Sequence, residues 1–169
     1  MRVSSRIMPT LFRLFGRLPE TLRQYIVTRT SPAHRVGTAG IIRDGDRILL
    51  VRHTYRRGWG VPGGMMGWCE HPDDTIVREI REEVGLETVV LTEPYTYWLR
   101  RPRRVEVLYE LGLAEGATAA DARPTSPEIE EVAWFPDDGR PPMARKTLDM
   151  LAWVDQMREA RAEQAANLG

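Results

Sequence analysis

A close-packed turn followed by a sharply bounded helix constrains the fold of this chain more than any other feature. The turn at 61–64 reads Val-Pro-Gly-Gly, and its two glycines let the backbone come close to other groups. Pro72 then stands at a favoured first-turn position, followed by two aspartates near the positive end of the helix dipole. Gly85 is a typical helix terminator. The sequence therefore predicts a tight loop that leads into a helix over 72–84.

The predicted helix carries three glutamates on one face. Glu79, Glu82 and Glu83 stand at offsets of zero, three and four, which makes them neighbours on the helix surface. Stacked like charges destabilise an isolated helix, so they need a compensating partner. One interpretation is an ordinary solvated face, because Arg78 and Arg81 are nearby. The other is a hard divalent cation, which prefers several carboxylate oxygens.

The turn and the helix together form a longer pattern of fixed spacing. Its fixed positions are Gly64, Glu70, Arg78, Glu79, Glu82, Glu83 and Gly85, with apolar Ile80 and Leu86 between and after them. Seven fixed positions match by chance on the order of 10⁻⁹ per register at ordinary residue frequencies. The segment resembles the complete Nudix box, G-x5-E-x7-R-E-U-x-E-E-x-G-U with U apolar, and no fixed position departs from it. The chain is thus identified by resemblance as a member of the Nudix hydrolase family, over roughly residues 36–156.

The remaining periodicity gives an α–β–β–loop–α–β–β–β–α order, an α+β or mixed α/β domain. The resemblance implies a Nudix-like α/β/α sandwich with a mixed central sheet, plus an N-terminal helical extension. We expect a basic amphipathic helical extension at 1–33, a Nudix hydrolase domain at 34–160 and a frayed C-terminal tail at 161–169. The closing helix is expected to begin at Arg140.

The resemblance also implies roles for individual residues. Glu79, Glu82 and Glu83 would hold Mg²⁺ or Mn²⁺, with the carbonyl of Gly63 as a further ligand. Arg78, within reach of Glu70, would orient these carboxylates by ion pairing. Glu82, Glu83 and Arg78 are accordingly the expected catalytic residues. One carboxylate of the cluster, or another from a downstream loop, would accept a proton as general base.

Other candidates each have an ordinary structural alternative. Glu128 is a candidate additional acid, against a solvated strand edge. Arg52 is a candidate for binding substrate phosphate, against a surface arginine. Trp59 could stack on a substrate base, against packing in the core. Arg56, Arg57 and the arginines at 100–104 could meet phosphates, but the sequence favours a hairpin of solvated arginines.

Charge and composition exclude several classes of protein. Lys+Arg and Asp+Glu are equal at 24 each, which removes the electrostatic case for a stable nucleic-acid partner. No apolar run approaches the ~20 residues of a membrane span. The single cysteine, Cys69, cannot form an internal disulfide, so we expect a reducing, cytoplasmic location.

The N-terminal segment is locally basic. Residues 1–35 contain seven arginines and one acidic residue, and apolar residues recur at helical spacing over 8–27, interrupted at Pro19. Such a helix could cover one side of the domain, form a homodimer contact or associate with acidic lipid.

The function implied by the resemblance is Mg²⁺-dependent hydrolysis of a nucleoside diphosphate linked to another moiety, by attack of water on one phosphorus. The partner would be a small-molecule nucleotide: ADP-ribose, a nucleotide sugar, a CDP-alcohol or a nucleoside triphosphate. Two alternatives stay open. The chain could act on the 5′ end of RNA, with its arginine clusters following the phosphates, or it could be a sensor that binds a nucleotide without turnover.

Overall fold

The computed structural model describes residues 8–31 and 33–168. Contacts divide the chain into two compact units, Met1–His34 and Arg35–Gly169. Positions 1–7, 32 and 169 of the expected extension and tail lie outside the described residues. Within the described ranges, no helix combines the length and the apolar character that crossing a lipid bilayer requires.

The first unit contains two helices, α1 (Met8–Gly16) and α2 (Glu20–Thr30). Pro19 stands immediately before α2, and since proline lacks an amide hydrogen it separates the two helices. This confirms the predicted interruption. α2 buries none of its side chains.

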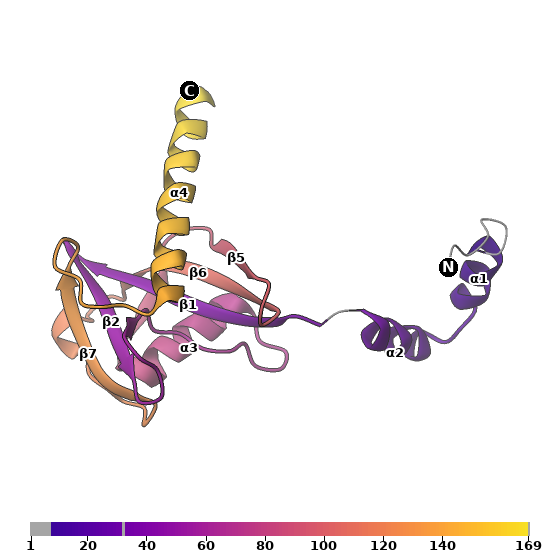
Figure 1. Ribbon diagram of the computed structural model, residues 1–169, viewed down its shortest axis with the longest axis horizontal. Coiled ribbons are helices and arrows are strands. Elements are labelled where there is room, and N and C mark those ends of the chain that lie inside the picture. Colours follow the sequence, from indigo (N-terminus) through magenta and orange to yellow (C-terminus); the bar gives the residue numbers. More distant parts are fainter. Residues whose placement is uncertain (1–7, 32, 169) are drawn as a thin grey trace. The chain divides into compact units, whose positions relative to one another are not determined.

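The second unit is built on a seven-stranded mixed sheet (Figure 1). Its strands are β1 (Arg35–Asp44), β2 (Arg47–His53), β3 (Trp59–Gly60), β4 (Thr88–Val90), β5 (Tyr95–Leu99), β6 (Arg104–Leu113) and β7 (Ile129–Pro136). The order is β3-β2-β1-β6-β4, with β5 paired to β6 and β7 paired to β2. β1 and β6 run parallel, whereas the other pairs are antiparallel.

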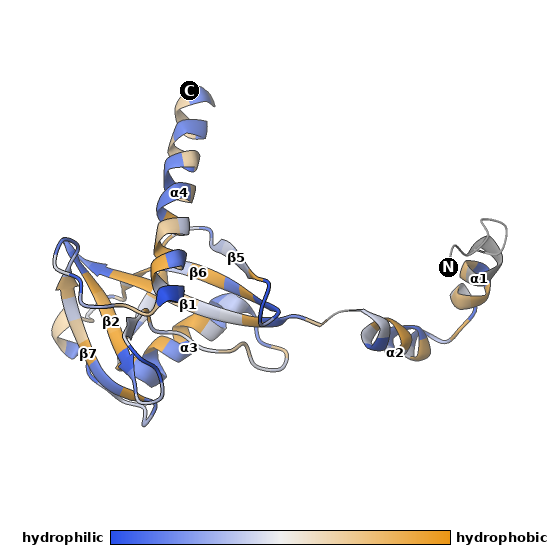
Figure 2. Cartoon of the chain, in the orientation of Figure 1, coloured by the Kyte–Doolittle hydropathy of each residue, from blue (hydrophilic) through white to orange (hydrophobic). Residues whose placement is uncertain are grey.

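Two helices, α3 (Pro72–Val84) and α4 (Arg145–Leu168), cover opposite faces of this sheet. Successive strand residues point to opposite faces, and the two core clusters follow this alternation. On one face Met150, Leu151 and Val154 of α4 pack with Ile41, Ile48 and Leu50. On the other, Ile76, Ile80 and Val84 of α3 pack with Ile42, Leu49 and Val51. Figure 2 shows β2 as largely hydrophobic between these layers. The α/β/α sandwich is therefore confirmed.

The helix α3 has the bounds that the sequence predicts. His71 occupies the N-cap, where its Nδ1 accepts a hydrogen bond from the amide of Asp73 (3.4 Å). Gly85 ends the helix in the left-handed conformation, with φ of 69°. A 3-10 turn, η1 (Ala119–Asp121), lies within the long loop that follows β6.

The helix α4 differs from the prediction at both ends. It begins at Arg145 and not at Arg140, because the preceding segment pairs with the edge strand β3. The carbonyl of Pro142 accepts a hydrogen bond from the amide of Trp59 (3.1 Å), and two successive prolines cannot supply helical amide donors. At its other end α4 remains helical to Leu168, through the segment expected to fray.

Candidate active site

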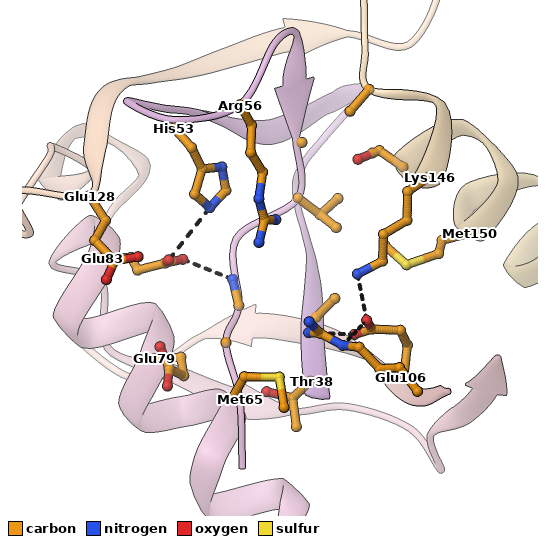
Figure 3. Close-up of a pocket in the computed structure, with 18 of the residues that line it drawn as sticks. Thr38, His53, Arg56, Met65, Glu79, Glu83, Glu106, Glu128, Lys146 and Met150 are labelled. Atoms are coloured by element: carbon orange, nitrogen blue, oxygen red, sulfur yellow. Dashed lines mark hydrogen bonds and ion pairs between the residues drawn. The ribbon is translucent and has the colours of Figure 1, made fainter. Parts of the chain in front are cut away.

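A pocket of about 420 Å³ lies between α3 and the first turns of α4, above β1 and β3 (Figure 3). Its lining comes from distant parts of the second unit: Thr38, Ala39, His53, Tyr55, Arg56, Gly58, Gly60, Val61, Gly63, Gly64, Met65, Glu79, Glu83, Arg104, Glu106, Glu128, Ala144, Lys146, Thr147 and Met150. Glu79, Glu83 and Glu128 lie on the side of α3, opposite Lys146 on α4 (Figure 3). We call these three glutamates the acidic wall.

Two members of the acidic wall come from one face of α3. The side chains of Glu79 and Glu83 are only 16% and 8% exposed. Burial raises the pKa of Glu79, and the negative charges of Glu83 and Glu82 act in the same direction. Glu82 shares the helix face in sequence but is 54% exposed and lies outside the pocket lining. The structure therefore brings two of the three predicted carboxylates into the pocket and leaves the third at its edge.

Arg78 links the glutamates of the helix to the loop before it. Its guanidinium donates two hydrogen bonds to Glu70, from Nε (2.7 Å) and Nη2 (2.9 Å). Its Nη1 donates to Glu79 (2.9 Å) and to Glu82 (3.0 Å). The Arg78 hydrogen bonds, together with one from the amide of Gly67, lower the pKa of Glu70 to about 2. This geometry agrees with a positioning role for Arg78.

The turn at 61–64 contacts α3 through a backbone hydrogen bond to Glu83. The amide of Gly63 donates to Glu83 (2.8 Å), whose other oxygen lies 3.7 Å from Nε2 of buried His53. Gly63 has φ of 141°, a conformation that side chains rarely adopt, and a Cβ atom there would overlap the carbonyl of Thr38. Glycine is thus required at position 63 for the turn to reach the helix.

The acidic wall suits a divalent cation by its chemistry, although the carboxylates are not gathered into a ready cluster. Among residues 8–31 and 33–168, no group of three His, Cys, Asp or Glu side chains is arranged to hold a metal ion. The reason is local: Arg78 holds Glu82 at the surface, and the Gly63 amide occupies one oxygen of Glu83. Hard cations prefer such carboxylate oxygens, and a cation beside Glu79 would relieve the repulsion that burial strengthens. The donor set therefore fits Mg²⁺ or Mn²⁺.

The family model described as the NUDIX domain matches residues 33–154. This chain belongs to the Nudix family. The ADP-ribose pyrophosphatase candidate YjhB of Bacillus subtilis is 28% identical over 118 residues, which are 68% of this chain and 56% of that protein. The chain thus matches little more than half the length of this relative.

Two solved structures share the fold. The NUDIX hydrolase from Nitrosomonas europaea is 25% identical, with a TM-score of 0.62, and the match covers 72% of this chain and 69% of that one. The MutT NUDIX hydrolase from Burkholderia pseudomallei is 26% identical, with a TM-score of 0.58, and covers 72% of this chain and 98% of that one.

Glu128, the residue immediately before β7, lines the same pocket. Its carboxylate accepts a hydrogen bond from the hydroxyl of Tyr55 (3.2 Å), and its carbonyl accepts one from the amide of Thr54 (2.9 Å). Burial raises the pKa of Tyr55, and the hydrogen bond to Glu128 adds to this. No sequence motif indicated Tyr55 or His53 as pocket residues, because their places depend on the pairing of β2 with β7.

Arg52 and Trp59 lie outside the residues that line the Nudix pocket. Arg52 pairs with Glu131 (2.8 Å) and Glu130 (3.3 Å), and Trp59 packs edge-on against Phe135 at 4.8 Å between ring centroids. The physical reason is strand alternation: Arg52 pairs with Trp59 across β2 and β3, while the next residue along β2, His53, points into the pocket. The placement favours the structural alternative for both residues.

A group of charged side chains lies in the pocket, and it includes Arg56 and Arg104, for which the sequence indicated a solvated hairpin. Lys146 and Arg104 both pair with the carboxylate of Glu106, which is 1% exposed. Arg56 also lines the pocket, and Figure 3 shows it between His53 and Lys146. We call Arg56, Arg104 and Lys146 the cationic group. Three distant segments supply it, so no local motif could indicate it.

Proposed function

We propose that this chain is a divalent-metal-dependent Nudix pyrophosphohydrolase that cleaves the diphosphate of a nucleoside diphosphate linked to another moiety. The observation that carries the proposal is the pair Glu79 and Glu83, partly buried and buried respectively, which line the pocket on the helix of a complete Nudix box. A nucleotide-binding protein without turnover has no need of neighbouring, mutually repelling carboxylates that are withdrawn from solvent.

ADP-ribose is the first substrate that we propose. The support is the name of the Bacillus subtilis relative, an ADP-ribose pyrophosphatase candidate. Nucleotide sugars, CDP-alcohols and nucleoside triphosphates belong to the same proposal, because each contains a phosphoric anhydride attached to a nucleoside.

The residues proposed to hold Mg²⁺, or alternatively Mn²⁺, are Glu79, Glu82, Glu83 and the carbonyl of Gly63. When bound, such a cation neutralises charge on a diphosphate and lowers the pKa of a bound water. Arg78 keeps Glu79 and Glu82 oriented through its hydrogen bonds, and the bidentate contact with Glu70 fixes Arg78 itself. The protein thus contributes charge and orientation, on which phosphoryl transfer depends.

We propose Glu128 as the residue that accepts a proton from the attacking water. It lines the pocket together with Glu79 and Glu83 but stands outside the hydrogen-bond network of Arg78. The hydroxyl of Tyr55 orients its carboxylate. Unlike exposed Glu128, the pocket carboxylate of Glu83 is buried, held by the Gly63 amide and beside His53.

A substrate panel tests this proposal. The protein is incubated with ADP-ribose, a nucleotide sugar, a CDP-alcohol and a nucleoside triphosphate, with Mg²⁺, with Mn²⁺ and with EDTA. We expect metal-dependent release of a nucleoside monophosphate from one class well above the others. Binding without turnover of any compound would favour the sensor. Turnover of a 5′-triphosphorylated RNA oligonucleotide alone would favour the RNA-directed alternative. A cytoplasmic location and a homodimer stay predictions.

A further inference from the structure

The side of the pocket facing the acidic wall contains more positive charge than its own structure requires. Glu106 lies on the central strand β6 and is 1% exposed, so its carboxylate needs a partner. One cation would neutralise it, but both Lys146 and Arg104 pair with it. Arg56 adds a third positive charge to the same pocket. The cationic group therefore exceeds its buried counter-ion by two charges.

The position of Arg104 depends on a specific glycine. Arg104 begins β6, and Gly37 lies opposite Glu106 on the neighbouring strand β1. A Cβ atom at position 37 would overlap the guanidinium of Arg104. The arginine therefore packs over a bare stretch of strand, with its side chain 18% exposed. The other arginines of this turn, at 100, 101 and 103, are exposed to solvent.

Lys146 is an unfavourable residue for its place in the fold. It lies in the first turn of α4, where the helix dipole disfavours a cation. Burial lowers its pKa, its pairing with Glu106 opposes this, and the charges of Arg104 and Arg56 lower the pKa further. It is also the only lysine in the chain. A bound anion would relieve each of these costs.

We propose that Arg56, Arg104 and Lys146 form an anion subsite, which takes a second acidic group of the substrate, a phosphate or a carboxylate separate from the diphosphate that is cleaved. This inference rests on the proposed function, because the acidic wall is taken as the place of cleavage. Glu106 is the positioning residue: it holds Lys146 and Arg104 side by side from below. The substrate class is therefore a nucleoside diphosphate derivative with an additional negative charge.

Two matched pairs of compounds test the subsite. UDP-glucose and UDP-glucuronate differ by a carboxylate, and ADP-ribose and its 2′-phosphate differ by a phosphate. For the wild-type protein in Mg²⁺, we expect kcat/KM for the member with the additional acidic group to exceed that of the member without it about tenfold or more in at least one pair, as for a charge-assisted contact. Equilibrium dissociation constants of the same compounds are measured by calorimetry on the Glu82→Gln variant in Mg²⁺, where turnover is slowed.

Substitutions then connect the preference with the cationic group. Lys146→Met should bring the ratio of kcat/KM with and without the additional acidic group close to one, whereas Lys146→Arg, which keeps the charge, should retain the preference. The matched control is Arg145→Met, because Arg145 is the neighbouring cation on α4 and is 91% exposed. Far-ultraviolet circular dichroism and thermal unfolding establish that each variant is folded.

The outcomes separate the two proposals. The subsite is overturned if the two members of both pairs have nearly equal kcat/KM and dissociation constants, or if neither member of either pair binds detectably. It is also overturned if the preference survives Lys146→Met. Absence of turnover by the wild-type protein of these four compounds and of every member of the substrate panel, together with a preserved preference in the calorimetric binding ratio, would instead overturn the proposed function and support the subsite.

Discussion

The carboxylate of Glu79 lies directly against the backbone of Gly64, so closely that a Cβ atom at position 64 would overlap it. The neighbouring amide of Gly63 donates to Glu83 (2.8 Å), which brings the turn and α3 together at this point. The spacing between the first glycine of the Nudix box and its helical glutamates therefore has a steric meaning. Position 64 must lack a side chain for Glu79 to occupy its place in the pocket.

Gly64→Ala should reduce activity without reducing stability. Gly64 has an ordinary backbone conformation, unlike Gly63, so alanine causes no strain there. The methyl group would displace only the end of the Glu79 side chain. We expect kcat to fall about tenfold or more, since each ~1.4 kcal/mol of lost transition-state stabilisation is tenfold in rate. The midpoint temperature of thermal unfolding should be unchanged or slightly raised. A matching loss of stability and activity would mean that the turn itself is disrupted.

Glu82→Gln should lower turnover far more than it lowers stability. Its side chain is 54% exposed, and removing its charge relieves repulsion with Glu79 and Glu83. Because a metal contributes several kcal/mol to charge stabilisation, we expect kcat at saturating Mg²⁺ to fall about 100-fold or more. Exposed Glu87 lies just beyond the box, so Glu87→Gln is the matched control and should retain wild-type kcat. A Glu82→Gln variant with near wild-type kcat would refute the assignment of this carboxylate as a ligand.

Glu70 should make stability depend on pH in the acidic range. Arg78 and the amide of Gly67 lower its pKa from 4.5 to about 2 in the folded protein. A lowered folded-state pKa stabilises the fold above the unfolded value and loses this effect as pH falls through the folded value. The difference in unfolding free energy between the wild type and Glu70→Gln should be largest above pH 4.5 and shrink toward pH 2. Urea titrations at several pH values measure it, and a constant difference would contradict the ion pair.

The ion pair of Arg158 with Glu110 should stabilise the packing of α4 on the sheet. Its guanidinium donates two hydrogen bonds of 2.8 Å to Glu110 of β6, which also accepts one from Tyr95 (2.8 Å). The Arg158 contact lowers the pKa of Glu110, although burial opposes this. Arg158→Met should lower the free energy of unfolding by about 1–3 kcal/mol, because it leaves Glu110 half-buried with one partner fewer. Arg145→Met on the exposed side of α4 should change it by about 0.5 kcal/mol or less, as measured by urea denaturation.

Local signals allowed the helix and its chemistry to be predicted. Pro72 and Gly85 are the first residue and the C-cap of α3, because proline and glycine limit backbone conformation without help from the rest of the fold. The box also indicated that Arg78 would reach Glu70, and the structure has this contact. Neither the exposure of Glu82 nor the burial of Glu83 followed from spacing alone, since both depend on how the turn packs against α3.

Non-local pairing explains what the sequence did not reveal. The pairing of Lys146 with Glu106 depends on how the start of α4 packs against β6, and Arg104 lies in the pocket because β6 pairs in parallel with β1. The arginine run at 100–104 reads as one solvated hairpin, yet the sheet separates its last member from the others. The start of α4 was likewise set by a backbone contact with Trp59 on β3.

The most direct test of the account is a Mn²⁺ titration that records bound metal and hydrolysis in the same samples. Bound Mn²⁺ is measured by electron paramagnetic resonance, and products are measured from ADP-ribose or the best substrate of the panel. We expect bound Mn²⁺ and turnover to rise together, with both strongly reduced in Glu82→Gln and retained in Glu87→Gln. Turnover that persists in EDTA, or Mn²⁺ binding that is the same in Glu82→Gln as in the wild type, would contradict the central claim that the box carboxylates hold the catalytic metal.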